Sequence, residues 1–181
     1  FFGIIMISPT SLVCLHIIHN EKRLVKTEEK DDFMIQYRIG DATIPHAKKT
    51  VIAHICNDEN IWEAGFVLAL SKRYPQAKEA YLNASLKLGD VQWIEVDENV
   101  MVANMIAQKG VLSHDNPHPI DYHALDICLE KVFTQAKKSD YTVQMPKIGV
   151  GLAGGRWDII EPLITQNQRD VNCIVCLLNT K

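Results

Sequence analysis

Four of the chain's nine glycines fall within seven consecutive positions of the stretch MPKIGVGLAGGRW, which runs from residue 145 to residue 157. Glycine loses more conformational freedom on folding than any other residue, so a cluster of this kind needs a physical reason. A bare turn is one such reason. The other is an anion that approaches backbone N–H groups closely because no side chain stands in the way. The four residues are Gly149, Gly151, Gly154 and Gly155.

Polar residues also follow two apolar segments earlier in the chain. Gly40 and Asp41 come after one segment, and Asn57 and Asp58 come after the next. In α/β folds, ligands collect at the carboxyl ends of strands, so we expect these loops and the glycine loop to meet in one site. The loop around Gln108 follows a further apolar segment and is expected at the same edge. A cap or an Asx-turn is the competing role for Asp41, Asn57 and Asp58.

The alternation of strand and helix patterns predicts the fold that positions these loops. Runs of apolar and β-branched residues indicate strands, and apolar residues three and four apart indicate helices. One pair of strands is joined by the short turn 97–99, which indicates a hairpin, whereas other strands are joined through helices. We therefore expect a three-layer α/β/α fold with a mixed central sheet. Strands are expected over 34–39, 51–56, 90–96, 100–106, 141–145 and 171–178, and helices over 66–74, 77–88, 125–136 and 157–166.

The composition favours one domain with a single sizeable core, since 47% of the 181 residues are hydrophobic. A formal charge of −3 and a pI near 6.2 argue against sequence-specific binding of nucleic acid. The five cysteines are an odd and scattered set, unlike a disulfide framework, so we expect a reducing, cytoplasmic setting. Cys173 and Cys176 have the spacing of a metal or redox pair. In a strand, however, they point to opposite faces, which favours an ordinary core role.

The first 33 residues form a segment distinct from the domain that we expect over 34–181. The stretch FFGIIMISPTSLVCLHIIH is apolar but interrupted by polar residues, and its basic residues come after it rather than before. A membrane span needs about 20 cleaner apolar residues, so no membrane association is expected. We expect an added hairpin or an extension upstream of a natural start at Met34, with a signal peptide or anchor as the alternative.

Several histidines and tryptophans have side chains that could serve as ligands. The histidines of segment 113–123 suggest zinc, but that segment has no cysteine partner and two prolines, which favours a solvated loop. No metal and no cofactor are therefore expected. His54 lies in an apolar strand and is expected to be a hydrogen-bonded core histidine. Trp62 and Trp157 are equally suited to the core and to stacking on a ligand.

The glycine loop matches the dinucleotide-binding pattern G-x-G-x-x-G in form at residues 149–154. That pattern is weak alone, and here it comes late in the chain, without an acidic residue at the end of a following strand. No lysine and Ser/Thr pair follows the glycines, which argues against a phosphate-binding loop of the Walker type.

Five stretches in order resemble the macro domain, an ADP-ribose-binding module. They are YRIGDAT, VIAHICND with AGFVLALSKRYPQAKEAY, LGDVQWIEV, VANMIAQKG and VQMPKIGVGLAGGRW, and together they span about residues 34 to 178. The chain looks most similar to the branch that holds the ADP-ribose-1″-phosphate phosphatase and the terminal ADP-ribose protein glycohydrolase. The resemblance implies ADP-ribose or an ADP-ribosylated macromolecule as the partner.

The same resemblance implies a role for each loop. Asp41 matches the aspartate that accepts a hydrogen bond from the adenine amino group. Asn57 and Asp58 match the loop around the distal ribose, and Gly65 and Phe66 match the part that faces the diphosphate. The phosphate-binding loop is matched by Gly149, Val150, Gly151, Leu152, Ala153 and Gly154. A helix N-terminus and a set of backbone amides attract an anion without net positive charge on the protein.

The chain departs from this branch where catalysis is concerned. Gln108 stands where the glycohydrolases carry a lysine nucleophile, and Ala153 stands where they carry an aspartate. Lys109 is one place on, and the alternation of a strand turns it to the opposite face. Glu63 replaces a glycine ahead of the helix, and a carboxylate near a diphosphate lowers affinity unless it points away.

General acid–base hydrolysis is the chemistry that these departures leave open. Asp58 is expected to orient a water towards the distal ribose, helped by Asn57 and Gln108. His54 is a further candidate, because the phosphatase branch also carries a histidine on this strand. Three functions follow: a hydrolase of ADP-ribose derivatives, a non-catalytic reader of ADP-ribose, and an unrelated nucleotide-binding α/β protein or one whose site has decayed.

Overall fold

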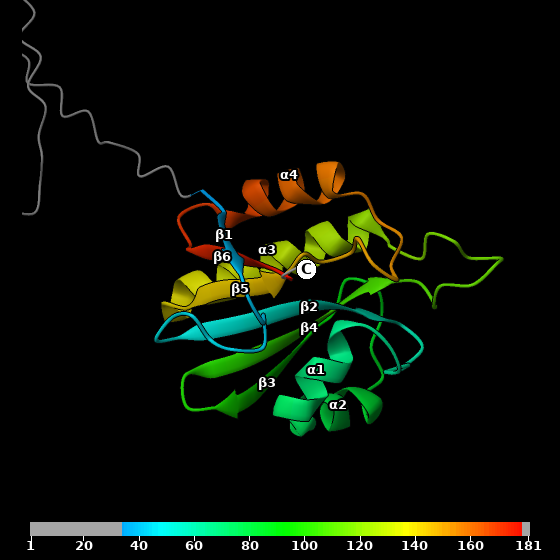
Figure 1. Ribbon diagram of the computed structural model, residues 1–181, viewed down its shortest axis with the longest axis horizontal. Helices are drawn as coiled ribbons and strands as arrows, with labels where there is room; N and C mark the ends of the chain where they lie inside the picture. The colour runs from blue at the N-terminus through cyan, green and yellow to red at the C-terminus, as the bar shows by residue number, and fades with distance from the viewer. Residues whose placement is uncertain (1–33, 179–181) are drawn as a thin grey trace, which may run out of the picture. The chain divides into compact units, whose positions relative to one another are not determined.

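A computed structural model of the protein describes residues 34–178 (Figure 1). The hairpin, upstream extension, signal and anchor considered for the first 33 residues lie outside the described residues. The described part holds one six-stranded sheet in the order β1-β6-β5-β2-β4-β3, with four helices. The strands are β1 (Gln36–Ile39), β2 (Thr50–Asn57), β3 (Val91–Asp97), β4 (Val100–Gln108), β5 (Thr142–Pro146) and β6 (Cys173–Leu177), and the helices are α1 (Phe66–Arg73), α2 (Pro75–Leu82), α3 (Tyr122–Ser139) and α4 (Trp157–Gln168).

The sheet is mixed, as the sequence predicts. β1, β6, β5, β2 and β4 run parallel to their neighbours, and β3 pairs with β4 in the antiparallel sense. The hairpin between β3 and β4 turns at Asn99, which has a positive φ of 61°, a conformation that asparagine tolerates. Because five strands are parallel, their carboxyl ends meet at one edge of the sheet. The loops that follow β1, β2, β4 and β5 therefore lie near one another.

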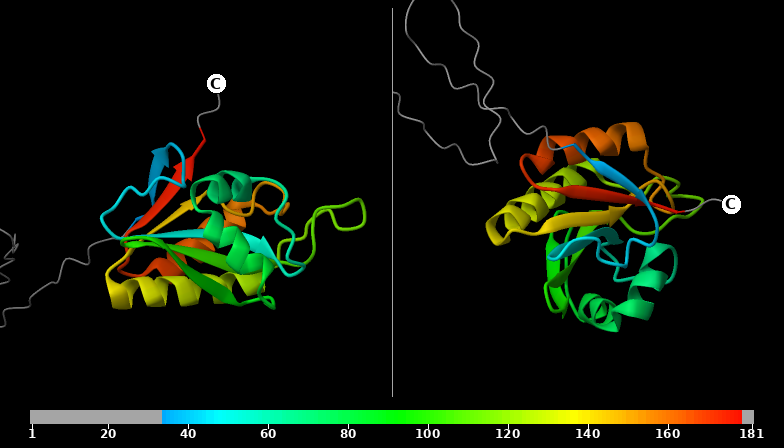
Figure 2. Two further views of the ribbon diagram at one scale, coloured as in Figure 1. Left: turned by 90° about the horizontal axis from the view of Figure 1, so that it is seen from below. Right: turned by 60° about the vertical axis from the view of Figure 1, so that its left-hand side comes forward.

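Helices cover both faces of the sheet and confirm the three-layer fold. α3 and α4 lie on one face, and α1 and α2 lie on the other (Figures 1 and 2). The first core contains Leu129 and Phe133 of α3, and the second contains Leu70 of α1 and Tyr81 of α2. Removing a leucine or aromatic side chain of this kind from water contributes about 1.5–3 kcal/mol to stability.

The second helix is shorter than its apolar pattern predicts. The pattern continues to residue 88, whereas α2 ends at Leu82. The side chain of Asn60 provides the reason, because its Nδ2 donates to the carbonyl oxygens of Tyr81 and Ala84 at 3.2 and 2.7 Å. These bonds satisfy carbonyl groups at the helix end that would otherwise lack a partner.

The cysteines of the described residues are free and buried. Cys173 belongs to the core under α3 and α4, whereas Cys176 packs with Ala42 and Ile174. The two thiols therefore serve different clusters, which confirms the ordinary core role. Burial raises the pKa of Cys173 to about 12, so its thiol stays protonated.

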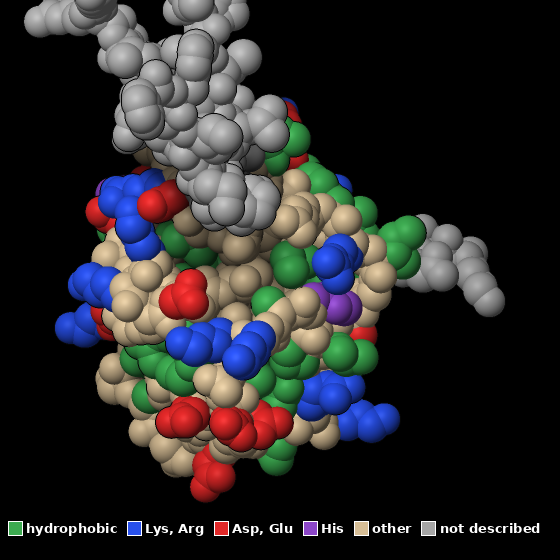
Figure 3. All heavy atoms as spheres, turned by 90° about the vertical axis from the view of Figure 1, so that its left-hand side faces the viewer, with side chains coloured by type: hydrophobic (Ala, Val, Ile, Leu, Met, Phe, Trp, Pro, Cys, Tyr) green, Lys and Arg blue, Asp and Glu red, His purple; other side chains and the backbone are tan. Residues whose placement is uncertain are grey.

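The described residues include no helix that is long and apolar enough to cross a membrane. On the face that Figure 3 shows, basic and acidic side chains stand in small separate groups on the part that grey atoms do not cover. No broad field of one sign extends over that area, in keeping with the small net charge.

Candidate functional site

The predicted site loops gather where the parallel strands end. The loop 109–121 after β4 and the loop 147–156 after β5 lie on the same side of the molecule (Figure 1). The segment 57–65 after β2 joins them, because Asp58 N–H donates to the carbonyl of Gln108 at 3.0 Å. Parallel strand order alone brings these three loops together.

A cavity of about 300 Å³ opens between these loops. Most of its wall is apolar, and its polar side chains come from the ends of β2 and β4 and from the segment ahead of α1. This composition is typical of a small-molecule site, with a few polar groups to orient the ligand. The lining residues are Ile55, Cys56, Asn57, Ile61, Glu63, Ala64, Val67, Gln108, Val111, Leu112 and Leu152.

Asn57 lines this cavity and also builds the loop that follows it. Its Oδ1 accepts from the N–H groups of Glu59 and Ile61 at 3.0 Å, and from the hydroxyl of Tyr81 at 3.0 Å. Its Nδ2 donates to the carbonyl of Ile61 at 2.7 Å. The side chain therefore folds the 57–61 segment into a compact turn, which is the competing role that the sequence gives, and it does so from the cavity wall.

Asp58 and Gln108 both hold Gly110. The Asp58 Oδ1 accepts from the N–H of Gly110 at 2.7 Å, and the Gln108 Nε2 donates to the carbonyl of Gly110 at 2.9 Å. Gln108 lines the cavity, whereas Asp58 is not among its lining residues. The structure thus brings Asn57 and Gln108 together and places the Asp58 carboxylate beside the loop after β4.

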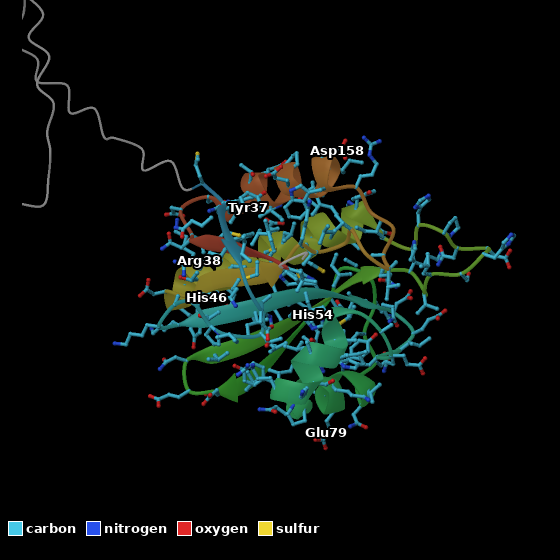
Figure 4. The ribbon with its side chains drawn as sticks, viewed as in Figure 1. Tyr37, Arg38, His46, His54, Glu79 and Asp158 are labelled. Carbon is cyan, nitrogen blue, oxygen red and sulfur yellow. The ribbon has the colours of Figure 1, made fainter. Side chains whose placement is uncertain are left out.

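His54 is fully enclosed beside α1 (Figure 4). Its Nε2 donates to Asn104 Oδ1 at 2.6 Å, and its ring packs against Trp62 and Phe66 with centroids 5.4 and 5.6 Å away. Burial lowers the pKa of His54 to about 4, although the Asn104 bond acts the other way. The imidazole is therefore neutral near pH 7 and serves as a hydrogen-bonded core residue.

Three glycines of the loop after β5 are required by the fold itself. Gly149 and Gly154 have positive φ values of 75° and 66°, which side chains rarely adopt. A Cβ on Gly154 would lie 2.6 Å from the carbonyl oxygen of Pro117, and one on Gly155 would lie 2.7 Å from that of Gly149. A tight turn against neighbouring backbone therefore explains these three residues.

Gly151 is different, because nothing lies within 4 Å of the position of its Cβ and its φ is not positive. The residue is exposed and faces open space. Within residues 34–178, the backbone N–H groups of Val150, Gly151, Leu152 and Ala153 have no hydrogen-bond partner. Backbone N–H groups without partners in a glycine-rich loop are a common means of binding an anion, and Gly151 adds no side chain that would block one.

The N-terminus of α1 lies next to this loop. A Cβ on Gly65, the residue that precedes α1, would lie 3.5 Å from the Leu152 side chain. Phe66 begins the helix and packs against the buried cluster that contains Ala42, one residue after Asp41. The positive end of a helix dipole and the free N–H groups of the glycine loop therefore lie beside one another.

The loop after β1 is held by a residue that the strand and loop patterns do not single out. Gln144 of β5 is completely buried, and its Nε2 donates to the carbonyls of Ala42 and Ile44 at 2.8 Å. Its Oε1 accepts from the N–H of His46 at 3.0 Å. Within the same loop, Asp41 is exposed and its Oδ1 accepts from the N–H of Thr43 at 2.8 Å. In the sequence, the signal of the role of Gln144 is a single glutamine inside the apolar strand YTVQM.

Two further contributions to the site depend on the histidine-rich loop. The sequence predicts a solvated loop, and His114 is indeed exposed. Its first part, however, supplies Val111 and Leu112 to the cavity wall. His118 Nδ1 donates to the carbonyl of Gly154 at 2.9 Å, which ties this loop to the glycine loop.

The two tryptophans left open by the sequence take different positions. Trp62 is 3% exposed, donates from Nε1 to the carbonyl of Val67 at 3.0 Å, and packs on Tyr81. It is therefore a core residue beneath the cavity loop. Trp157 begins α4 and contacts Tyr37 edge-on, with Lys147 Nζ 5.3 Å from its ring centroid.

No family model matches the chain, but several known proteins are similar to it in sequence. The mouse chromodomain-helicase-DNA-binding protein 1-like is 32% identical over 158 residues, which are 77% of this chain but only 17% of that protein. The ADP-ribose 1″-phosphate phosphatase of Candida albicans is 27% identical over 146 residues, which are 74% of this chain and 93% of that protein.

Among solved structures, a macrodomain protein from Streptomyces coelicolor is similar along almost its entire length. It is 38% identical, has a TM-score of 0.68, and the match covers 81% of this chain and 99% of that one. A match of this extent is about as long as the described part of the chain.

Proposed function

Because the chain belongs to the macrodomain family, we propose that it binds ADP-ribose and hydrolyses ADP-ribose derivatives. The observation that carries this proposal is the set of free backbone N–H groups from Val150 to Ala153 beside the N-terminus of α1. Two such groups of donors suit a diphosphate, which needs neutralisation without bulky side chains. The phosphatase of Candida albicans, whose name includes an ADP-ribose derivative, supports the same ligand.

The proposed ligand extends from the loop after β1 to the cavity. Asp41 would accept from the adenine amino group, Gly65 and Phe66 would face the diphosphate from α1, and the distal ribose would enter the cavity at Asn57. The glycine loop would hold the other side of the diphosphate through Gly149, Val150, Gly151, Leu152, Ala153 and Gly154. No residue in this arrangement needs a metal or a cofactor.

We expect Asp41→Ala to weaken ADP-ribose binding about tenfold or more, since a lost hydrogen bond to a charged acceptor costs about 1.5–3 kcal/mol. Calorimetric titration of ADP-ribose measures this change. Asp41→Asn is the matched control, because it keeps Oδ1 for the Thr43 turn and replaces only Oδ2. Equal losses in both variants support recognition of adenine through Oδ2, whereas a loss confined to Asp41→Ala would mean that Asp41 acts through the turn.

For hydrolysis, we propose that Asp58 orients the attacking water and that Asn57 and Gln108 hold the distal ribose. Asp58→Asn keeps an oxygen for the Gly110 N–H but removes the carboxylate. Turnover should therefore fall about 100-fold, the lower range for a general base, while the Kd for ADP-ribose should stay about the same. Release of ADP-ribose from an ADP-ribosylated substrate measures this. Unchanged turnover with binding intact would refute the role of Asp58.

A non-catalytic reader of ADP-ribose is the alternative function. Gln108 and Ala153 favour it, because the glycohydrolase branch that the chain resembles carries a lysine and an aspartate at these positions. Asp58 favours it as well, because it lies outside the cavity lining. A wild-type protein that binds ADP-ribose without releasing any product would establish this alternative.

We further propose that residues 34–181 form the macrodomain. The partner is ADP-ribose or an ADP-ribosylated macromolecule rather than a specific nucleic-acid sequence or a membrane. The free buried cysteines support a reducing, cytoplasmic setting.

A further inference from the structure

The cavity contains one charged side chain among its eleven lining residues, the carboxylate of Glu63. Glu63 is also exposed, so it belongs both to the cavity wall and to the solvent-accessible surface. None of the other lining residues is Lys, Arg or His. A ligand group that enters this cavity therefore meets negative charge without a compensating cation.

The neutral polar groups of the cavity do little to offset this charge. Asn57 Nδ2 already donates to the carbonyl of Ile61, and Gln108 Nε2 already donates to the carbonyl of Gly110. Each amide thus keeps one N–H at most for a ligand, because an amide nitrogen has two. An oxyanion with three strong acceptor oxygens would remain largely unsatisfied.

Two more carboxylates lie close to the same wall. Asp58 Oδ1 accepts from the N–H of Gly110, and a Cβ on Gly110 would lie 3.3 Å from Glu59 Oε1. The neighbouring basic residue, Lys109, is exposed and is not among the lining residues. Acidic side chains therefore predominate around the cavity, although the free N–H groups of the glycine loop offer an anion a favourable place nearby.

We infer that Glu63 makes the cavity select ADP-ribose derivatives with an uncharged substituent on the distal ribose and reject those with a phosphate there. This inference rests on the proposed binding of ADP-ribose. A phosphate monoester carries a charge of about −1.5 to −2 near pH 7 and repels a carboxylate at close range. The diphosphate escapes this repulsion because it has backbone donors of its own, and the apolar walls favour a neutral group.

The chain is thus expected to differ in substrate specificity from the phosphatase to which it is similar. The Candida albicans protein is named for a 1″-phosphate substrate, whereas the cavity described here has Glu63 in its wall. The charge at position 63 thus determines specificity, and the backbone amides that hold the diphosphate serve either substrate.

The test is calorimetric titration of ADP-ribose and of ADP-ribose 1″-phosphate into the full chain, its Glu63→Gln variant and a Glu79→Gln control. The control removes one charge from α2, away from the cavity (Figure 4). We expect the wild type and the control to bind ADP-ribose at least about tenfold more tightly than the phosphate, as about 1.4 kcal/mol of repulsion would give. In Glu63→Gln, the ratio of the two dissociation constants should fall close to one, because ADP-ribose 1″-phosphate binds more tightly than it does to the wild type. In about 1 M salt, where the Debye length is about 3 Å, the wild-type ratio should also shrink.

Two results would overturn the inference while leaving the proposed function intact. One is a wild type that binds both ligands equally, and the other is a Glu63→Gln variant that shifts both affinities by the same factor. A wild type that binds neither ligand would instead refute the proposed function, and the inference with it. Glu63 makes no hydrogen bond within residues 34–178, so the variant is expected to fold normally.

Discussion

Gly151→Glu should abolish measurable ADP-ribose binding, with a loss of at least about 100-fold, while leaving the free energy of unfolding unchanged. The new side chain has room, since nothing lies within 4 Å of the Cβ position and φ is not positive. Its carboxylate would stand over the free N–H groups of residues 150–153, where it would block the diphosphate and repel it. A loss of about 100-fold corresponds to about 2.8 kcal/mol of binding free energy. Calorimetric titration together with urea unfolding measures both quantities.

Gly154→Ala is the matched control in the same loop. Its φ of 66° and the carbonyl of Pro117 at 2.6 Å from the added Cβ should destabilise the protein by about 1–3 kcal/mol. One substitution is thus expected to affect binding alone, and the other to affect stability. Retained binding in Gly151→Glu would contradict the phosphate-binding role of the loop.

Gln144→Leu should lower the free energy of unfolding by about 2–4 kcal/mol and weaken ADP-ribose binding about tenfold. Leucine fills a similar volume, but it leaves the carbonyls of Ala42 and Ile44 and the N–H of His46 without their buried partner. Each unsatisfied group costs about 1–3 kcal/mol when it is shielded from water. The loop that carries Asp41 would then lose its attachment to β5. Urea unfolding followed by tryptophan fluorescence, and calorimetric titration of the folded variant, measure the two effects.

Gln92→Leu controls for the loss of any glutamine from the sheet. Gln92 Nε2 donates to the carbonyl of Ala80 and its Oε1 accepts from Asn104, both outside the site loops. This variant should lose stability without a selective loss of affinity. Wild-type binding in Gln144→Leu would show that the Asp41 loop does not need its attachment to β5.

Most of the fold follows from patterns that are local in sequence. Apolar runs of strand length and helical spacing place all six strands and four helices within a few residues of their observed bounds, with α2 as the exception. That exception has a long-range cause, because Asn60 lies 22 residues before the Leu82 carbonyl with which it interacts. A periodic apolar pattern carries no information about such a partner.

The edge of the sheet at which the site loops gather was also determined by the sequence alone. In α/β folds, ligands collect at the carboxyl ends of strands, so the loops that follow the strands are expected to meet at one edge. This rule by itself predicts that Asp41, Asn57, Gln108 and the glycine loop lie near one another. The glycines themselves were a weaker signal, because the turn requires three of the four, and only Gly151 has no steric reason of its own.

Tertiary structure alone decided which polar groups face the cavity. The sequence made Asp58 the principal candidate, with Asn57 and Gln108 in supporting roles, but the Gly110 N–H engages the Asp58 carboxylate from 52 residues away. Glu63 was known from the sequence only as a departure from its relatives, and the structure places it in the cavity wall. Side-chain direction at the end of a strand depends on the neighbouring loop, which the sequence pattern does not describe. The alternation of elements therefore determines where a site forms, whereas contacts between distant loops determine which side chains act in it.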